Sequence, residues 1–252
     1  MIQPRRAIVV GGAGGIGGAT VHALDQQGYR IVVADFDFAR AQKVLDQLQG
    51  KDHEAVRLDV TEPQTIVAAF DAIEASDPAS ILVVASGGPT SSLEHAGTIA
   101  TAKLSDWDKA LALNLTGVFN CLQAFARLRL AAPLPDARVV IVGSTAGHLA
   151  GNGTDVAYSV SKAGLLGLAR QAAVDLAPAG ITVNIVSPGP VATPELFRNT
   201  NEQIRTGIAA LSVFKRLATP EEVGAGIVYL LSREAAFITG ATLDINGGSL
   251  MR

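Results

Sequence analysis

Residues 7–18 read Ala7-Ile8-Val9-Val10-Gly11-Gly12-Ala13-Gly14-Gly15-Ile16-Gly17-Gly18, a short apolar run followed by a cluster of glycines. The apolar run is typical of a buried strand, and helical spacing follows in residues 21–27. The glycines fit Gly12-x-Gly14-x-x-Gly17 or Gly11-x-x-x-Gly15-x-Gly17. Either pattern lets a pyrophosphate approach the amino end of a helix, where free N–H groups and the helix dipole favour anions. Because the cluster lies between a predicted strand and a predicted helix, it indicates dinucleotide binding more strongly than a flexible turn.

Short β-branched runs alternate with longer segments of helical spacing along the rest of the chain. The expected strands are 7–10, 30–34, 55–59, 81–85, 139–142, 182–186 and 241–245, and the expected helices are 21–27, 39–48, 65–75, 107–130, 159–177 and 221–231. Strands rich in Val and Ile that alternate with helices predict a parallel sheet covered on both faces. We therefore expect one α/β domain over residues 1–252, a Rossmann-like, doubly wound parallel sheet of about seven strands with helices on both faces.

Composition excludes several classes of protein. The net charge is −3 and no basic run occurs, so the chain lacks the electrostatic footprint of a nucleic-acid partner. No run of about 18 apolar residues is found, so we expect no membrane span. The chain shows no cleavable signal pattern, and its single cysteine, Cys121, fits a reducing, cytoplasmic location. The four histidines are scattered and form no metal-ligand cluster with cysteine, so we expect no metal.

Asp35 ends the second predicted strand, 18 residues after Gly17. An acidic residue about 20 positions beyond a dinucleotide fingerprint accepts the ribose hydroxyls of NAD and repels the extra phosphate of NADP. No basic residue follows Asp35 until Arg40. The pattern therefore favours NAD, with NADP as the open alternative because Arg40 could reach round to the same place.

Tyr158 and Lys162 lie four positions apart at the start of a predicted helix, so their side chains share one face. A tyrosine with an unperturbed pKa of about 10 is a poor base near neutral pH, and a neighbouring ammonium lowers that pKa. Such a tyrosine can take a proton from an alcohol or give one to a ketone. On this pair alone, a surface helix with a chance Tyr–Lys neighbour is the simpler interpretation.

The wider sequence resembles the short-chain dehydrogenase/reductase (SDR) family over nearly the whole chain. The matching motifs, in order, are Gly11-Gly12-Ala13-Gly14-Gly15-Ile16-Gly17, Asp59-Val60, Asn114-Leu115-Thr116-Gly117, Val142-Gly143-Ser144-Thr145-Ala146-Gly147, Tyr158-Ser159-Val160-Ser161-Lys162, Ser187-Pro188-Gly189-Pro190-Val191-Ala192-Thr193, Pro220-Glu221-Glu222-Val223, and Thr239-Gly240 with Asn246-Gly247-Gly248. Two departures stand out. Val10 replaces the usual Thr, and Val84-Ala85-Ser86-Gly87 replaces the family's Asn-rich turn.

The resemblance implies a catalytic tetrad. Tyr158 would be the general acid/base, and Lys162 would lower its pKa and hold the nicotinamide ribose. Ser144 would hydrogen-bond the substrate oxygen, and Asn114 would kink its helix and hold a water that passes protons to Lys162. The residues implied for the cofactor are Gly11, Gly14, Gly15, Ile16, Gly17, Asp35, Asp59, Val60, Ser86, Gly87, Tyr158, Lys162, Pro188, Gly189, Val191 and Thr193.

The substrate is the least determined part of the sequence interpretation. The resemblance implies a pocket at Ser144 and Tyr158, and His148, Asn152 and Phe197 lie where a substrate could meet them. A segment at about 190–216 resembles the family's mobile lid, although its apolar residues also fit an amphipathic helix packed on the body. The pocket loops are mixed but largely apolar, so we expect a secondary alcohol or the matching ketone, including cyclic, sugar-like or hydroxyacyl compounds.

Three functions remain open from the sequence. The first is an NAD-dependent dehydrogenase or ketone reductase acting on CH–OH groups. The second is a 3-oxoacyl-thioester reductase, acting on acyl carrier protein or CoA thioesters with NADPH, and the third is an NAD-binding sensor or scaffold without turnover. Helices 107–130 and 159–177 carry apolar residues beyond one stripe, as buried interface helices do, so we expect the chain to associate. The resemblance implies a homo-oligomer, with a tetramer favoured.

Overall fold

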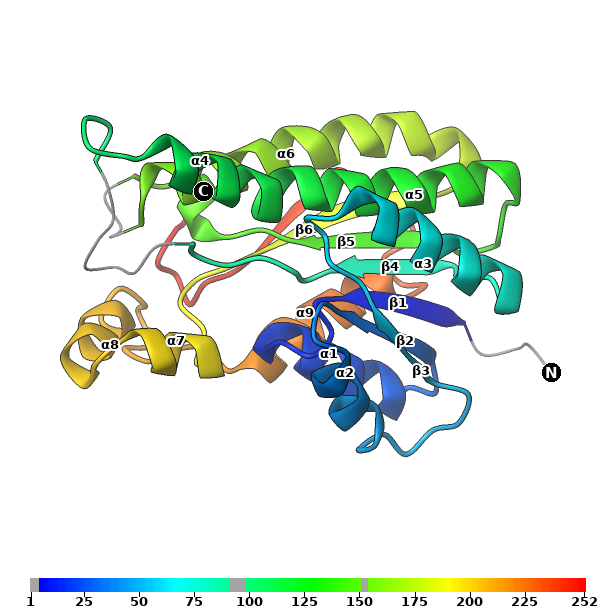
Figure 1. Cartoon of the computed structure of the whole chain (residues 1–252). Coiled ribbons are helices and arrows are strands. Elements are labelled where there is room, and N and C mark those ends of the chain that lie inside the picture. The colour runs from blue at the N-terminus through cyan, green and yellow to red at the C-terminus, as the bar shows by residue number, and fades with distance from the viewer. Residues whose placement is uncertain (1–4, 91–97, 151–153) are drawn as a thin grey trace.

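The computed structural model describes residues 5–90, 98–150 and 154–252. One parallel sheet of seven strands, in the order β3-β2-β1-β4-β5-β6-β7, runs through the described chain (Figure 1). The strands are β1 (Arg6–Val10), β2 (Arg30–Asp35), β3 (Glu54–Arg57), β4 (Ile81–Val84), β5 (Arg138–Val142), β6 (Thr182–Pro188) and β7 (Thr242–Ile245). The expected α/β class and doubly wound parallel sheet are confirmed.

Helices cover both faces of this sheet (Figure 1). They are α1 (Gly15–Gln26), α2 (Phe38–Leu45), α3 (Pro63–Ser76), α4 (Leu104–Leu111), α5 (Gly117–Ala131), α6 (Val156–Leu176), α7 (Pro194–Asn199), α8 (Glu202–Ala209) and α9 (Pro220–Leu231). Helices α3, α5 and α6 pack on one face, while α1, α2 and α9 pack on the other.

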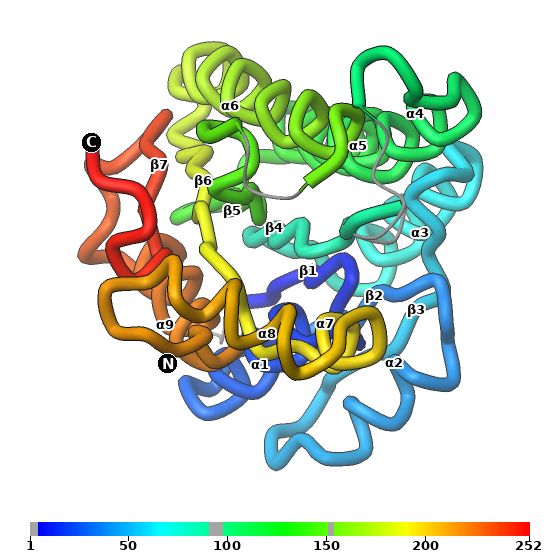
Figure 2. Tube along the Cα trace, turned by 90° about the vertical axis from the view of Figure 1, so that its left-hand side faces the viewer, coloured from blue at the N-terminus to red at the C-terminus, as the bar shows by residue number. Residues whose placement is uncertain are grey.

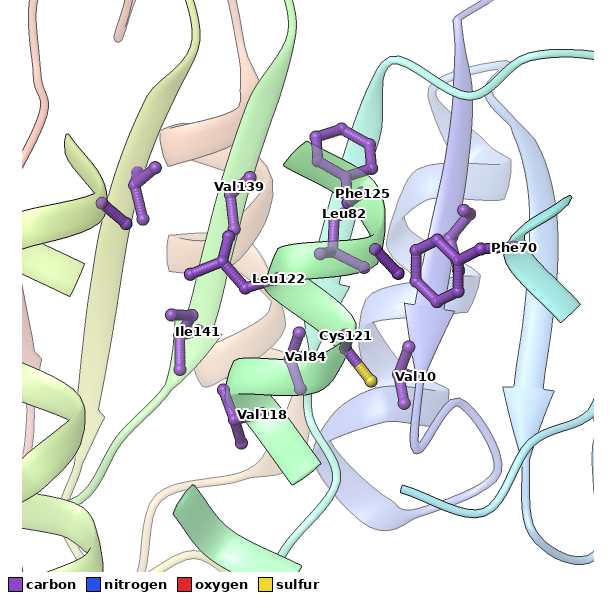
Figure 3. Packing of buried hydrophobic residues seen from close by; sticks show 14 of the residues in the cluster. Val10, Phe70, Leu82, Val84, Val118, Cys121, Leu122, Phe125, Val139 and Ile141 are labelled. Carbon is purple, nitrogen blue, oxygen red and sulfur yellow. The ribbon is translucent and has the colours of Figure 1, made fainter. Parts of the chain in front are cut away.

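Alternate side chains of the buried strands point to opposite faces of the sheet, so each strand contributes to two hydrophobic cores. Ile8 and Val10 of β1 belong to the cluster under α3, α5 and α6, whereas Ala7 and Val9 belong to the cluster over α1 and α9. The strand is therefore apolar at consecutive positions, as expected when both faces of a parallel sheet are covered. Figure 3 shows the first cluster, in which Cys121 and Leu122 of α5 lie over the strands.

Among the expected boundaries that differ from the structure, three concern elements that border the carboxyl ends of the strands or their helices. The first helix begins at Gly15 rather than Val21, because the glycine loop itself makes the first turn. The long helix expected over 107–130 is interrupted by a π-helical turn at Ala112–Thr116, between α4 and α5. In the third strand only Glu54–Arg57 pairs with β2.

The carboxyl ends of the strands meet at one edge of the sheet, which we call the carboxyl edge. Strand β1 pairs with both β2 and β4, so successive connections from it leave in opposite directions. This is the topological switch point at which open α/β sheets bind ligands. Helices α7 and α8 lie on that side, opposite the layer of α4, α5 and α6 (Figure 2).

The two ends of the α7–α8 segment are joined to each other. Val191 and Ala218 form an isolated parallel β-bridge. Ala192 N–H donates to the Ala218 carbonyl at 2.9 Å, and Ala218 N–H donates to the Pro190 carbonyl at 3.0 Å. The segment between them is therefore a loop closed at its base. Among the described residues, no helix is long and apolar enough to cross a membrane.

Candidate active site

The glycine loop leaves the amino end of α1 open. Gly14 is the N-cap residue and makes no side-chain cap hydrogen bond, so the backbone N–H groups of the first turn face outward without an intrahelical partner. A Cβ at Gly17 would lie 2.0 Å from the Gly11 carbonyl oxygen, so only glycine permits this close approach of loop and helix. The arrangement has the chemistry of an anion site at a helix terminus.

Asp35 and Arg40 both hold the peptide groups of the same loop residue. The Asp35 carboxylate accepts from the Ala13 N–H at 3.1 Å and from the Asp37 N–H at 3.1 Å, and its side chain is buried. The Arg40 guanidinium donates to the Ala13 carbonyl at 2.7 Å. The Arg40 side chain therefore extends to the end of β2, where the Asp35 carboxylate and the Arg40 guanidinium both contact Ala13.

A cleft runs along the carboxyl edge from this pair toward α7. We call it the carboxyl-edge cleft. The lining residues that the sequence predicted for a cofactor are Gly11, Gly14, Gly15, Ile16, Gly17, Asp35, Asp59, Val60, Ser86, Gly87 and Thr193. Phe36, Leu58, Leu113 and Glu195 also line it, and sequence reasoning did not single these out. Phe36 and Leu58 adjoin the predicted acidic residues Asp35 and Asp59, which could have identified them.

Two features of the cleft wall are consistent with the binding of a dinucleotide. The Ser86 hydroxyl is buried and makes no hydrogen bond with any described group. Gly15 lies under Thr193, since a Cβ at position 15 would be 2.8 Å from the Thr193 methyl carbon. The first turn of α1, the end of β4 and the start of the α7 segment thus form one continuous wall with unsatisfied polar groups.

Asn114 lies in the π-helical turn and is fully buried. Its carboxamide oxygen accepts from the Gly88 N–H at 2.8 Å, and its amide nitrogen donates to the Gly88 carbonyl at 3.1 Å. Gly87 has φ +126°, and a Cβ there would lie 2.6 Å from the Asn114 oxygen and 3.3 Å from Lys162 Nζ. The helix expected to kink at Asn114 thus has a π-helical turn there, and Asn114 bonds the loop after β4 at a point close to Lys162.

Ser144, Tyr158 and Lys162 converge beside this turn. Asp155 caps α6 by accepting from the Tyr158 N–H at 2.7 Å, which fixes the tyrosine in the first turn. Lys162 is buried, and its Nζ donates to the Val142 carbonyl at 3.1 Å and lies 5.7 Å from the centre of the Tyr158 ring. The structure thus brings together three side chains that are 14 and 4 residues apart in sequence.

Burial controls the ionisation of this cluster. It lowers the pKa of the Lys162 ammonium to about 8. Burial also raises the pKa of Tyr158, and a hydrogen bond with Ser144 opposes that rise only in part. Lys162 is not among the groups that shift the pKa of Tyr158, so the expectation that its ammonium lowers that pKa stays a prediction.

Two other residues expected to contact substrate, His148 and Phe197, each contact an arginine. His148 Nε2 lies 3.1 Å from the Arg252 guanidinium, which also donates to Asp244 at 2.8 Å. Phe197 is 51% exposed and stacks under Arg205, with 5.0 Å between the guanidinium carbon and the ring centre, and it does not line the carboxyl-edge cleft. Asn152 lies outside the described residues.

The remaining predicted residues follow β6. Pro188 ends that strand, the Gly189 N–H donates to the Ile245 carbonyl at 3.1 Å, and Val191 takes part in the bridge at the base of the α7–α8 segment. None of the three lines the cleft, and neither do Tyr158 and Lys162, which were also predicted to bind the cofactor. In the part of the chain that the structure describes, no group of His, Cys, Asp or Glu could hold a metal ion.

Comparison with known proteins agrees with this geometry. The family model described as "Enoyl-(Acyl carrier protein) reductase" matches residues 11–249. The chain is 32% identical over 245 residues to 3-oxoacyl-[acyl-carrier-protein] reductase FabG of Escherichia coli (strain K12), covering 97% of each protein. It is 35% identical over 251 residues to cis-4-hydroxycyclohexanecarboxylate dehydrogenase of Sinomonas cyclohexanicum, covering 97% of this chain and 96% of that protein.

A solved structure is similar to this chain over the whole length of the chain. The crystal structure titled as a 3-oxoacyl-[acyl-carrier protein] reductase with bound NAD from Brucella melitensis has a TM-score of 0.89 at 26% sequence identity. It covers 100% of this chain and 93% of that chain. With the matched family model, these relatives show that the chain is an oxidoreductase of the short-chain dehydrogenase/reductase family, which binds a nicotinamide cofactor and acts on a small-molecule substrate.

Proposed function

We propose that the protein is an NAD-dependent dehydrogenase/reductase that interconverts a secondary alcohol and its ketone, with Tyr158 as general acid/base. The observation that carries the proposal is the buried cluster of Ser144, Tyr158 and Lys162. Lys162 of this cluster lies against Gly87, which forms part of the wall of the cleft that extends from Asp35. A non-catalytic sensor would not require this cluster, and that alternative is the weakest of the three.

The protein residues divide the proton chemistry among them. In alcohol oxidation the Tyr158 phenolate takes the hydroxyl proton, and in the reverse direction the phenol returns it to the ketone oxygen. The Ser144 hydroxyl hydrogen-bonds that oxygen and stabilises the charge that develops there. A bound nicotinamide supplies hydride acceptance and donation at the substrate carbon.

Lys162 and Asn114 position the reacting groups. Lys162 Nζ donates to the Val142 carbonyl, which holds the ammonium beside Tyr158. A positive charge at this position favours the phenolate form of Tyr158. Asn114 bonds both backbone groups of Gly88 and so fixes the loop after β4, in which the neighbouring Gly87 lies against Lys162. We also propose that Asn114 holds a water that passes protons to Lys162.

Asp35 supports NAD as the cofactor. Its carboxylate lies in the cleft at the end of β2, where it would accept ribose hydroxyls and repel a phosphate. Arg40 at the same place supports some tolerance of NADP. The test is cofactor kinetics: Asp35→Ser should lower kcat/KM for NAD and raise it for NADP, each roughly tenfold or more. An unchanged ratio of the two values would contradict NAD selection by Asp35.

The second candidate is a 3-oxoacyl-thioester reductase that uses NADPH. The names of the Escherichia coli and Brucella melitensis relatives favour it, and the latter structure is titled with bound NAD. Assay of NADH formation from a panel of secondary alcohols, beside NADPH consumption with acetoacetyl-CoA, separates the two candidates. The favoured function predicts turnover of alcohols with NAD that Tyr158→Phe lowers by about 10²- to 10⁴-fold, while cofactor binding measured by calorimetry persists.

Three further properties are proposed with the function. Residues 1–252 form one domain, and a lid over about 190–216 closes on the substrate. A cytoplasmic homotetramer is the expected assembly, and exposed apolar side chains on α5 and α6, such as Phe119 and Val160, support association through those helices. Sedimentation velocity tests the tetramer.

A further inference from the structure

Glu195 places a carboxylate at the end of the carboxyl-edge cleft that Gly87 and Gly88 also line. It lies in the first turn of α7, which Thr193 caps by accepting from the Leu196 N–H at 3.2 Å. A Cβ at Gly88 would lie 3.1 Å from one Glu195 carboxylate oxygen and 3.4 Å from the other. Since Asn114 holds both backbone groups of Gly88, the carboxylate rests against a fixed part of the wall.

Each end of the cleft carries a carboxylate and a guanidinium. At the end near β2, Asp35 accepts from the Ala13 N–H and Arg40 donates to the Ala13 carbonyl. At the other end Glu195 has no described cation within 4 Å, although Arg198 lies one turn further along the same helix and also lines the cleft. The field of Glu195 reaches the reacting group, because its charge is among the causes that raise the pKa of Tyr158.

We propose that Glu195 selects substrates by charge, so that the enzyme prefers neutral or cationic secondary alcohols over alcohols that carry an anionic group near the reacting carbon. The inference rests on the proposed function, because it concerns the substrate class of the same site. A carboxylate on the substrate would lie in the same half of the cleft as Glu195 and be repelled, and an ammonium would be attracted. Glu195 acts by electrostatic selection, and Tyr158 remains the residue that moves the proton.

The expected size of the effect is modest because Glu195 is exposed to solvent. Two unit charges several ångströms apart in a water-filled cleft interact by an amount that changes kcat/KM by about three- to tenfold. The effect should fall as salt is added, since solvent-exposed charges are screened.

Three substrates that share one carbon skeleton and differ in charge test the proposal. The substrates are cis-4-hydroxycyclohexanecarboxylate, its neutral carboxamide and cis-4-(aminomethyl)cyclohexanol, each assayed with NAD and with NADP. In Glu195→Gln, kcat/KM for the anion should rise about three- to tenfold relative to the neutral carboxamide, and the value for the cation should fall by a similar factor. Glu202→Gln, on α8 and outside the cleft, removes the same charge and should leave both ratios as they are. Equal changes for all three substrates in Glu195→Gln would overturn the proposal.

A second measurement does not depend on turnover. The groups that act on the Tyr158 phenol are Ser144 from the end of β5, Asp155 from α6 and Glu195 from α7, with Lys162 beside the ring. The phenolate absorbance of Tyr158, taken as the difference between each protein and its Tyr158→Phe counterpart, should appear at lower pH in Glu195→Gln than in the wild type. An unmoved titration overturns the inference. If no substrate is turned over while the titration moves, the proposed function fails and the electrostatic role of Glu195 stands.

Discussion

At the amino edge of the sheet, where the strands begin, charged groups are paired with charged groups. Arg6 pairs with Glu54 and Asp77, and the buried Arg129 pairs with Glu74. At the carboxyl edge, Lys162 is equally buried, yet no described carboxylate lies within 4 Å of it and its Nζ donates to a backbone carbonyl.

The paired charges at the amino edge are those expected to stabilise the fold, and Lys162 at the carboxyl edge, with no carboxylate partner among the described residues, is the one expected to serve function. A buried charge without a counterion is costly, so a chain optimised only for stability would pair or replace Lys162. Tyr158 is likewise buried with a raised pKa. The amino edge pairs the buried Arg6 and Arg129 with carboxylates, whereas the buried Lys162 at the carboxyl edge has no such pair in the described part of the chain, which fits the contacts with cofactor and substrate proposed for it.

The largest change is expected at Gly87. Gly87→Ala would put a Cβ 2.6 Å from the Asn114 carboxamide oxygen at a backbone φ of +126°. We expect a loss of about 2–5 kcal/mol in the free energy of unfolding from overpacking and backbone strain, and a fall in kcat of at least about 100-fold because the added methyl would displace Asn114 and Lys162. Denaturant unfolding and steady-state kinetics measure the two effects. Wild-type kinetics in this variant would show that the close contact is not needed.

The second prediction concerns pH. Burial lowers the pKa of Lys162 to about 8 from its ordinary value of 10.5, so between these values the unfolded chain binds more protons than the folded one. The free energy of unfolding should therefore rise with pH above about 8, by at most about 1.4 kcal/mol per pH unit. Measured between pH 7 and 9.5, the difference between wild type and Lys162→Met should show this slope, and its absence would mean that Lys162 titrates normally.

A smaller loss is expected at the amino edge. His53 Nδ1 accepts from the Ile31 N–H at 3.1 Å, and its Nε2 lies 3.0 Å from the buried Asp25. His53→Ala leaves both groups without this partner, which should cost about 1–3 kcal/mol of unfolding free energy. Because the carboxyl edge is untouched, kcat should remain that of the wild type. A large fall in kcat at a temperature where the variant is folded would contradict the separation of the two edges.

The smallest expected effect has the opposite sign. Gly167 lies inside α6, and a Cβ there would meet no atom within 4 Å. Gly167→Ala should stabilise the protein by about 0.5–1 kcal/mol, because alanine loses less backbone entropy than glycine in a helix. Thermal unfolding measures the gain, and the variant is the matched control for Gly87→Ala.

The sequence predicted most of the fold, because consecutive apolar positions in the strands and the glycine cluster are local signals. It also predicted the convergence of Ser144, Tyr158 and Lys162, which depended on family motifs. It did not predict the raised pKa of Tyr158, since desolvation depends on atoms from several elements. Glu195 was missed because its contact with Gly88 joins residues that are far apart in sequence and share no motif.

The β-bridge between Val191 and Ala218 has a consequence for how this enzyme can diversify. The α7–α8 segment leaves and returns to the body at one point, so its length and sequence can change without altering the path of β6 or α9. A segment taken from a relative could be grafted between these two residues while the proton-transfer residues keep their places. Substrate range and chemistry can thus evolve as separate modules, with this bridge as the boundary between them.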